Sequence, residues 1–235
     1  MATELFETSA TYQDLERFLG ESGCAVCQCM AQSEQRYFDT LLYENAASPA
    51  TEARLRASNG FCGRHLQTLL SWRDPLGTAL MYGSILLERR RLIARWRKAR
   101  TNVRLLRLDR GLTGIGRLCP ACEAEGEAER RACEVLAAGL EAAAPLRKAW
   151  ESSEGLCWPH YVQTRALCQR GRALLDGHEA RRLDELGADV EALIQSFDYQ
   201  WRGTRTPEVQ SAWRRVVAAM AGRFQGGRAP RRREE

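Results

Sequence analysis

Apolar residues recur along most of the chain at spacings of three and four, which is the period of an amphipathic α-helix. In the first such stretch, residues 10–19, the side chains of Tyr12, Leu15, Phe18 and Leu19 fall on one face. No stretch alternates β-branched and aromatic residues on either side of a hairpin turn, so strands are not expected. The pattern therefore predicts an all-α protein.

Proline and glycine divide this pattern into separate helices. Three positions place a capping residue directly before a proline, which is typical of a helix start: Ser48-Pro49, Asp74-Pro75 and Thr206-Pro207. We predict an N-terminal helix in residues 1–23, a first repeat over 24–102, a linker over 103–118, a second repeat over 119–203, a C-terminal helix over 204–224 and a disordered basic tail over 225–235.

Length and composition allow a real hydrophobic core. The chain has 235 residues, of which 44% are hydrophobic and 28% are charged. The N-terminal residues lack the apolar segment of a signal peptide, and no apolar run approaches the roughly 18 residues that span a bilayer. We therefore expect a cytoplasmic protein without a membrane partner. Nine cysteines in a reducing compartment favour metal or redox chemistry over disulfides.

One pattern of cysteine and histidine is written twice. Four positions in each half have the spacing of metal ligands: Cys24-x-x-Cys27 with Cys62-x-x-His65, and Cys119-x-x-Cys122 with Cys157-x-x-His160. Each position in the second half follows its counterpart by the same offset, 119 − 24 = 95. The constant offset predicts an internal duplication in which each copy carries one Cys3His set.

The geometry of a helical hairpin allows each copy to close its own site. The helix expected after Cys27 is about 18 residues long, or roughly 27 Å. Residues 46–61 can return over that distance if about ten are helical and the rest extended. We expect each copy to be a hairpin that closes one site. The alternative is exchange, in which the cysteine pair of one copy meets the Cys-x-x-His of the other.

Three thiolates and one imidazole form a closed tetrahedral set that suits zinc. With no position left for water, zinc would be structural, and we expect two zinc ions per chain. An iron–sulfur cluster accepts the same ligands, and a Cys-x-x-Cys pair at a helix start also suits thiol redox chemistry. Both remain alternatives at this point.

Other residues accompany the ligands. Glu34 and Glu129 share the duplicated register, which makes them candidates to orient a ligand histidine; the alternative is a solvated carboxylate or an ion pair. Three cysteines have no counterpart in the other copy and are expected on helix faces or in the core: Cys29, Cys133 and Cys168. His178 also lacks a counterpart and is expected on the surface.

The strongest charge feature is the segment 88–110, whose ten basic and two acidic residues give 10 − 2 = +8 in a chain of net charge +5. Such asymmetry can mark a nucleic-acid surface, and a tryptophan within it can stack on a base. The alternative is a solvated helix face. The candidate contacts are Arg89, Arg90, Arg91, Arg95, Trp96, Arg97 and Lys98.

Both copies resemble an uncharacterised family of bacterial and archaeal proteins, described as a domain of unknown function. Its members combine a Cys-Pro-x-Cys start, a helix of the type Glu-x-x-Tyr-x-x-x-Leu-Leu-Tyr-Glu and a Gly-Phe/Leu-Cys-x-x-His turn. The first copy carries the helix over 34–44 and the turn over 60–65, and the second carries the start over 119–122 and the turn over 155–160. The resemblance covers roughly residues 20–200 and implies a helical metal-binding protein.

Signs of catalysis are few. The sequence holds no Gly-rich phosphate loop after a strand, no nucleophile elbow and no HExxH helix. We therefore expect a zinc-binding interaction or regulatory protein rather than an enzyme. The alternatives are an iron–sulfur or thiol redox protein, and nucleic-acid binding through 88–110.

Overall fold

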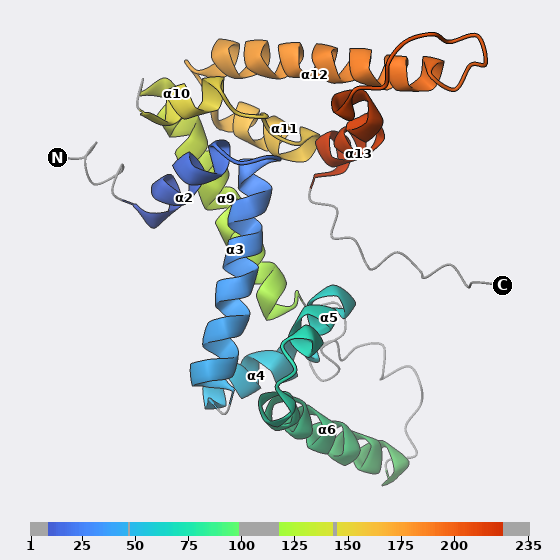
Figure 1. Ribbon diagram of the computed structural model, residues 1–235. Coiled ribbons are helices and arrows are strands. Elements are labelled where there is room, and N and C mark those ends of the chain that lie inside the picture. Colours follow the sequence, from blue (N-terminus) through green and yellow to red (C-terminus); the bar gives the residue numbers. More distant parts are fainter. Residues whose placement is uncertain (1–8, 47, 99–117, 143–144, 223–235) are drawn as a thin grey trace. The chain divides into compact units, whose positions relative to one another are not determined.

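The computed structural model describes residues 9–46, 48–98, 118–142 and 145–222. These residues form helices and no strand, which confirms the all-α prediction (Figure 1). In chain order the helices are α2 (Ala10–Leu19), α3 (Ala25–Thr40), the π-helix η1 (Leu41–Asn45), α4 (Pro49–Ser58), α5 (Gly63–Ser71), α6 (Pro75–Lys98), α9 (Pro120–Glu141), α10 (Pro145–Glu151), α11 (Trp158–Leu167), α12 (Arg172–Gln195) and α13 (Pro207–Ala221). None of the described helices is both long and apolar enough to cross a bilayer.

The helix starts follow the predicted capping signals. Helices α4, α6 and α13 each begin at the expected proline. The Thr206 side chain caps α13 by accepting a hydrogen bond from the backbone N–H of Val209 at 3.3 Å. Helix α2 spans the predicted residues, and its predicted apolar face is buried.

The chain divides into two compact units, and each unit combines segments of both predicted repeats. Unit 1 contains residues 1–30 and 128–235, and unit 2 contains residues 31–127. The division falls inside α3, after Met30, and inside α9, after Glu127, so each of these two helices belongs partly to unit 1 and partly to unit 2. Of the predicted linker only Leu118 is described, and the predicted tail 225–235 lies outside the described residues.

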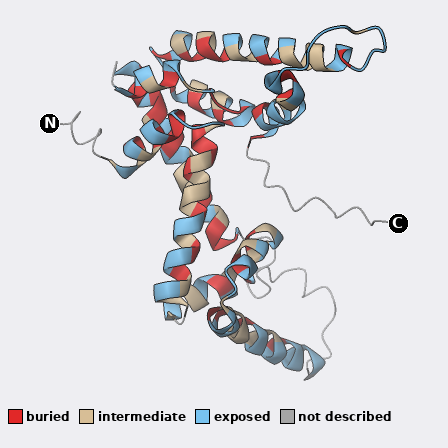
Figure 2. Cartoon of the chain, in the orientation of Figure 1, coloured by how far each residue is buried: buried red, intermediate tan, exposed pale blue. Residues whose placement is uncertain are grey.

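The core of unit 1 is built from α2, the first turns of α3, α9, α10 and α12. Leu15, Leu136, Trp150 and Leu175 are fully buried in it. Figure 2 marks buried positions along the helices in red. The Tyr12 hydroxyl accepts a hydrogen bond from the first turn of α10 at 3.3 Å. Burial of one such side chain stabilises a fold by roughly 1.5–3 kcal/mol, so this cluster fixes the start of α3 within the unit.

The core of unit 2 is built from α3, α4, α5 and α6. Phe38 is fully buried, and its ring lies 5.2 Å from that of Phe61, just before α5. Met81 and Ile85 bury one side of α6 in the same cluster. The core therefore holds the turn before α5, which carries two of the candidate ligands.

Candidate metal centres

In unit 1 the structure gathers four of the predicted ligands into one cluster, called site A here: Cys24, Cys27, Cys157 and His160. The Nδ1 atom of His160 lies 3.3 Å from the first two sulfurs and 3.0 Å from that of Cys157. The Sγ atoms of Cys27 and Cys157 are 3.8 Å apart. Three sulfurs and one nitrogen thus surround a common centre.

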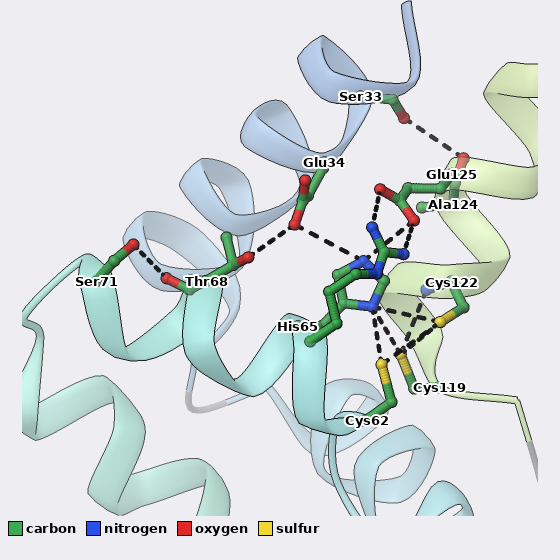
Figure 3. Close-up of polar contacts among 11 residues, drawn as sticks. Ser33, Glu34, Cys62, His65, Thr68, Ser71, Cys119, Cys122, Ala124 and Glu125 are labelled. Carbon is green, nitrogen blue, oxygen red and sulfur yellow. Dashed lines mark hydrogen bonds and ion pairs between the residues drawn. The ribbon is translucent and has the colours of Figure 1, made fainter. Parts of the chain in front are cut away.

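In unit 2 the other four predicted ligands form site B: Cys62, His65, Cys119 and Cys122 (Figure 3). The Nδ1 atom of His65 lies 3.3, 3.2 and 3.3 Å from the three sulfurs in that order. The Cys122 sulfur is 3.7 Å from that of Cys62 and 3.3 Å from that of Cys119. Both sites therefore present the same donor set in the same arrangement.

The expectation that each copy closes its own site is wrong. The cysteine pair of each copy meets the Cys-x-x-His of the other copy. Helix α4 has the ten residues that the return was expected to have, but the residues after it turn tightly and do not run extended: φ is +61° at Asn59 and +88° at Gly60. The return therefore ends part-way along α3, where His65 lies 3.8 Å from Glu34, seven residues past Cys27.

The Cys-x-x-His turns have the same backbone in both sites. Cys62 and Cys157 are the extended N-cap residues of α5 and α11, which places the histidine one turn later on the same face. A glycine with positive φ precedes each turn by two residues, at φ +88° for Gly60 and +77° for Gly155. A residue with a Cβ is strained in this conformation, so the glycines shape both turns.

A side chain of the following long helix supports each turn. In unit 2 the Tyr82 hydroxyl of α6 accepts a hydrogen bond from the backbone N–H of Phe61 at 3.0 Å. In unit 1 a carboxylate oxygen of Glu179 on α12 accepts one from Leu156 N–H at 3.3 Å. Both contacts fix the residue directly before the ligand cysteine. Helices α6 and α12 thus position one half of each site.

In site A the second nitrogen of the ligand histidine faces a carboxylate. The Nε2 atom of His160 lies 3.1 Å from Glu129, which also accepts a hydrogen bond from Gln163 at 2.8 Å. This contact fixes the ring and directs Nδ1 at the sulfurs, as carboxylates do for metal-bound histidines. The structure thus places Glu129 where the orienting role requires it.

In site B two buried carboxylates face the same histidine nitrogen. The Nε2 atom of His65 lies 3.2 Å from Glu125 and 3.8 Å from Glu34, which accepts a hydrogen bond from Thr68 at 2.8 Å (Figure 3). Arg64 donates two hydrogen bonds to Glu125. Burial alone would raise the pKa of Glu125, but these contacts with Arg64 and His65 lower it to about 2.

Glu125 was not among the predicted residues because the first half of the sequence has no acidic residue at the corresponding position. Its counterpart at the offset of 95 is Met30. The available signal was its position three residues after Cys122, which puts both side chains on one face of α9. Site B therefore has a buried carboxylate beside its histidine that pairs with a half-exposed arginine, and no such pair is found beside His160 among the described residues.

A comparison with protein-family models matches residues 13–226 to a family of unknown function, DUF6062. The chain belongs to this family. The match covers both ligand sets and every described helix from α3 to α13, and it confirms the resemblance drawn from the sequence motifs. Searches of curated proteins and of solved structures gave no match.

The three cysteines outside the sites are buried, as predicted for Cys29, Cys133 and Cys168. Burial raises the pKa of the Cys133 and Cys168 thiols to about 11, which makes them poor nucleophiles. The surface position expected for His178 is wrong. Its ring is buried 4.7 Å from that of Trp150, because the face of α12 that carries it packs on the core of unit 1.

The end of α13 covers site A. Gly222 follows α13 with φ +77°, and a Cβ at this position would lie 3.0 Å from the Cys157 sulfur and 3.6 Å from that of Cys27. Only a residue without a side chain allows the backbone to approach the sulfurs this closely. The C-terminal helix therefore shields the sulfurs of this site.

The candidate nucleic-acid contacts lie on the second half of α6. Arg89 is anchored on α4, where its Nε donates to the Asn59 side chain at 3.0 Å. The other described side chains of the set are exposed to solvent: Arg90, Arg91, Arg95, Trp96 and Arg97. The side chain of Lys98 lies outside the described part of the chain.

Proposed function

We propose that the protein binds two zinc ions, one at site A and one at site B, and that this metal-stabilised helical scaffold serves interaction or regulation rather than catalysis. The observation that carries the proposal is the set of ligand distances. Around one zinc ion, with bonds of about 2.3 Å to sulfur and 2.0 Å to nitrogen, tetrahedral ligands lie about 3.5–3.8 Å apart. The observed separations are 3.0–3.8 Å, which fits one contracted tetrahedral shell.

The same distances argue against an iron–sulfur cluster. In a cluster the four protein ligands are divided among two or four irons, so ligands on different irons are held apart by the inorganic core. In each site here all four ligand atoms lie within 4.8 Å of one another. Sulfur atoms 3.3–3.8 Å apart leave room for a single ion. This supports zinc over the iron–sulfur alternative, and it supports a mononuclear ion over any larger group.

A structural role follows from the donor sets and from what they connect. Each shell is filled by four protein ligands, which leaves no position for a substrate or an activated water. Site A joins residues 130 positions apart, and site B joins residues 54 positions apart. A metal ion at each site therefore closes a long loop and stabilises the unit that contains it.

The engagement of the histidines supports a role outside catalysis. His65 and His160 each direct Nδ1 at sulfur and Nε2 at carboxylate. His178, the third histidine of the chain, donates to the carbonyl of Ser153 at 3.1 Å. Each imidazole thus has a structural partner, and acid–base chemistry would require other groups.

Elemental analysis of protein purified without oxygen, combined with an absorption spectrum, tests the proposal. About two zinc ions per chain and no visible absorption band are expected. Iron with acid-labile sulfide and a broad visible band would instead establish clusters. A turnover that is lost in Cys27→Ser while helicity is kept would overturn the non-catalytic role.

A further inference from the structure

Helix α6 has two chemically different halves. Residues 75–87 carry no charged side chain, whereas residues 88–98 read Glu-Arg-Arg-Arg-Leu-Ile-Ala-Arg-Trp-Arg-Lys. Five large aliphatic side chains of the helix are about half exposed or more: Leu76, Leu80, Leu86, Leu87 and Ile93. Soluble proteins seldom leave so many large apolar side chains on one helix without a binding role.

The leucines and the arginines share the outward side of α6. Met81, Ile85 and Leu92 are buried and define the inward side, which packs on unit 2. Leu76, Leu80 and Leu87 are spaced by four and seven residues, so they form one stripe on the opposite side. Arg90 and Arg91 follow Leu87 by three and four residues and continue the same stripe.

Three kinds of ligand can be compared with this surface. Nucleic acid would pair with the arginines but would leave the leucines in water. A second copy of the chain would cover the leucines but would place arginine beside arginine or leave them unused. A bilayer surface with anionic headgroups satisfies both sets, because acyl chains bury the leucines while lipid phosphates pair with the arginines.

We propose that α6 adsorbs on anionic lipid surfaces, with Leu76, Leu80 and Leu87 in the interfacial region and Arg90 and Arg91 on the phosphates. The proposal rests on exposure and charge and does not depend on which metal the sites bind.

Adsorption fits the dimensions of the helix better than insertion across the bilayer. The uncharged stretch 75–87 is about 20 Å long, whereas the hydrocarbon core is about 30 Å thick. The expectation of no membrane partner rested on the absence of a spanning segment, and adsorption at a surface needs none. The arginines that follow the apolar half would stay at the level of the headgroups.

Sedimentation of the full-length, metal-loaded protein with lipid vesicles tests the proposal. We expect binding to vesicles of phosphatidylcholine mixed with phosphatidylglycerol and none to phosphatidylcholine alone. Arg90→Gln/Arg91→Gln should weaken binding about 25-fold, since each arginine near an anionic surface contributes about fivefold. The matched control Arg170→Gln/Arg181→Gln removes the same charge from exposed positions of unit 1 and should bind like the parent.

A second pair of variants separates lipid insertion from charge attraction. Leu80→Glu/Leu87→Glu should abolish vesicle binding while the circular dichroism spectrum and the metal content stay unchanged, because both side chains are exposed in the folded protein. Retained binding in this variant overturns the proposal, as does equal binding to both vesicle types.

Two further results would assign α6 to another ligand. Absence of vesicle binding together with salt-dependent binding of single-stranded RNA, lost in the arginine variant, would overturn the proposal in favour of nucleic acid. Absence of vesicle binding together with a dimer in light scattering, dissociated by Leu80→Glu, would overturn it in favour of a second copy.

Discussion

Replacing one ligand of site A should destabilise unit 1 far more than replacing a neighbouring buried cysteine. In Cys157→Ala the site keeps two thiolates and one imidazole, which bind zinc much more weakly than the full set. The ion joins the chain on either side of a loop of 130 residues between Cys27 and Cys157. The cross-link restricts mainly the unfolded chain, so loss of the ion raises the entropy of the unfolded state relative to the folded one.

The size of the effect follows from loop-closure entropy. The relation used for a covalent cross-link gives about 5 kcal/mol for a loop of this length at room temperature, and about 4 kcal/mol for the 54-residue loop of site B. The total stability of a domain is typically about 5–15 kcal/mol. Cys157→Ala should therefore bring unit 1 close to unfolding, with Cys119→Ala having a slightly smaller effect on unit 2.

Urea unfolding followed by circular dichroism, together with metal analysis, measures this difference. The matched control is Cys168→Ala, which removes an equally buried sulfur from unit 1 without touching a site. We expect the control to keep two zinc ions and lose about 1–2 kcal/mol. Equal stability and equal metal content in Cys157→Ala and Cys168→Ala would refute the reasoning.

Three further predictions concern the surroundings of the sites. Glu125→Gln should weaken metal binding at site B about 10- to 100-fold in a chelator competition, because the ligand histidine loses its charged partner; Glu123→Gln, at a surface ion pair, should leave affinity unchanged. Iodoacetamide at pH 8 should leave Cys133 and Cys168 unmodified in the folded protein, because burial raises the pKa of both thiols to about 11. Mass spectrometry measures the labelling, and the rate of modification should increase as the pH approaches 11. Gly60→Ala should lower thermal stability by about 1–2 kcal/mol or more, because its φ is +88° and its Cβ would lie 2.8 Å from the Tyr82 hydroxyl; a melting temperature equal to the parent would contradict this.

The sequence was sufficient for the helices and for the identity of the clustered residues. Helix starts depend on local chemistry, such as Thr206 before Pro207, and local chemistry is readable from spacing alone. The eight clustered positions could be picked out because the constant offset of 95 is read from the sequence alone. The helix expected to run about 18 residues after Cys27 changes from α-helix to π-helix at Leu41.

The partners of the ligands could not be read from the same pattern. Whether Cys62 returns to Cys27 depends on how the chain turns after α4 and on the packing of Phe38, and the spacing of the cysteines specifies neither. Glu125 was overlooked for a related reason. Its role comes from the approach of His65 from another helix, and the duplicated register pointed only to Glu34 and its counterpart.

NMR of the protein loaded with an NMR-active cadmium isotope tests the crossed arrangement of the ligands without any mutation. Cadmium replaces zinc in thiolate sites, and each ion shows scalar coupling to the protons of its own ligands. We expect two cadmium signals, one coupled to Cys24, Cys27, Cys157 and His160 and the other to Cys62, His65, Cys119 and Cys122. A signal coupled to Cys27 and Cys62 together would contradict it.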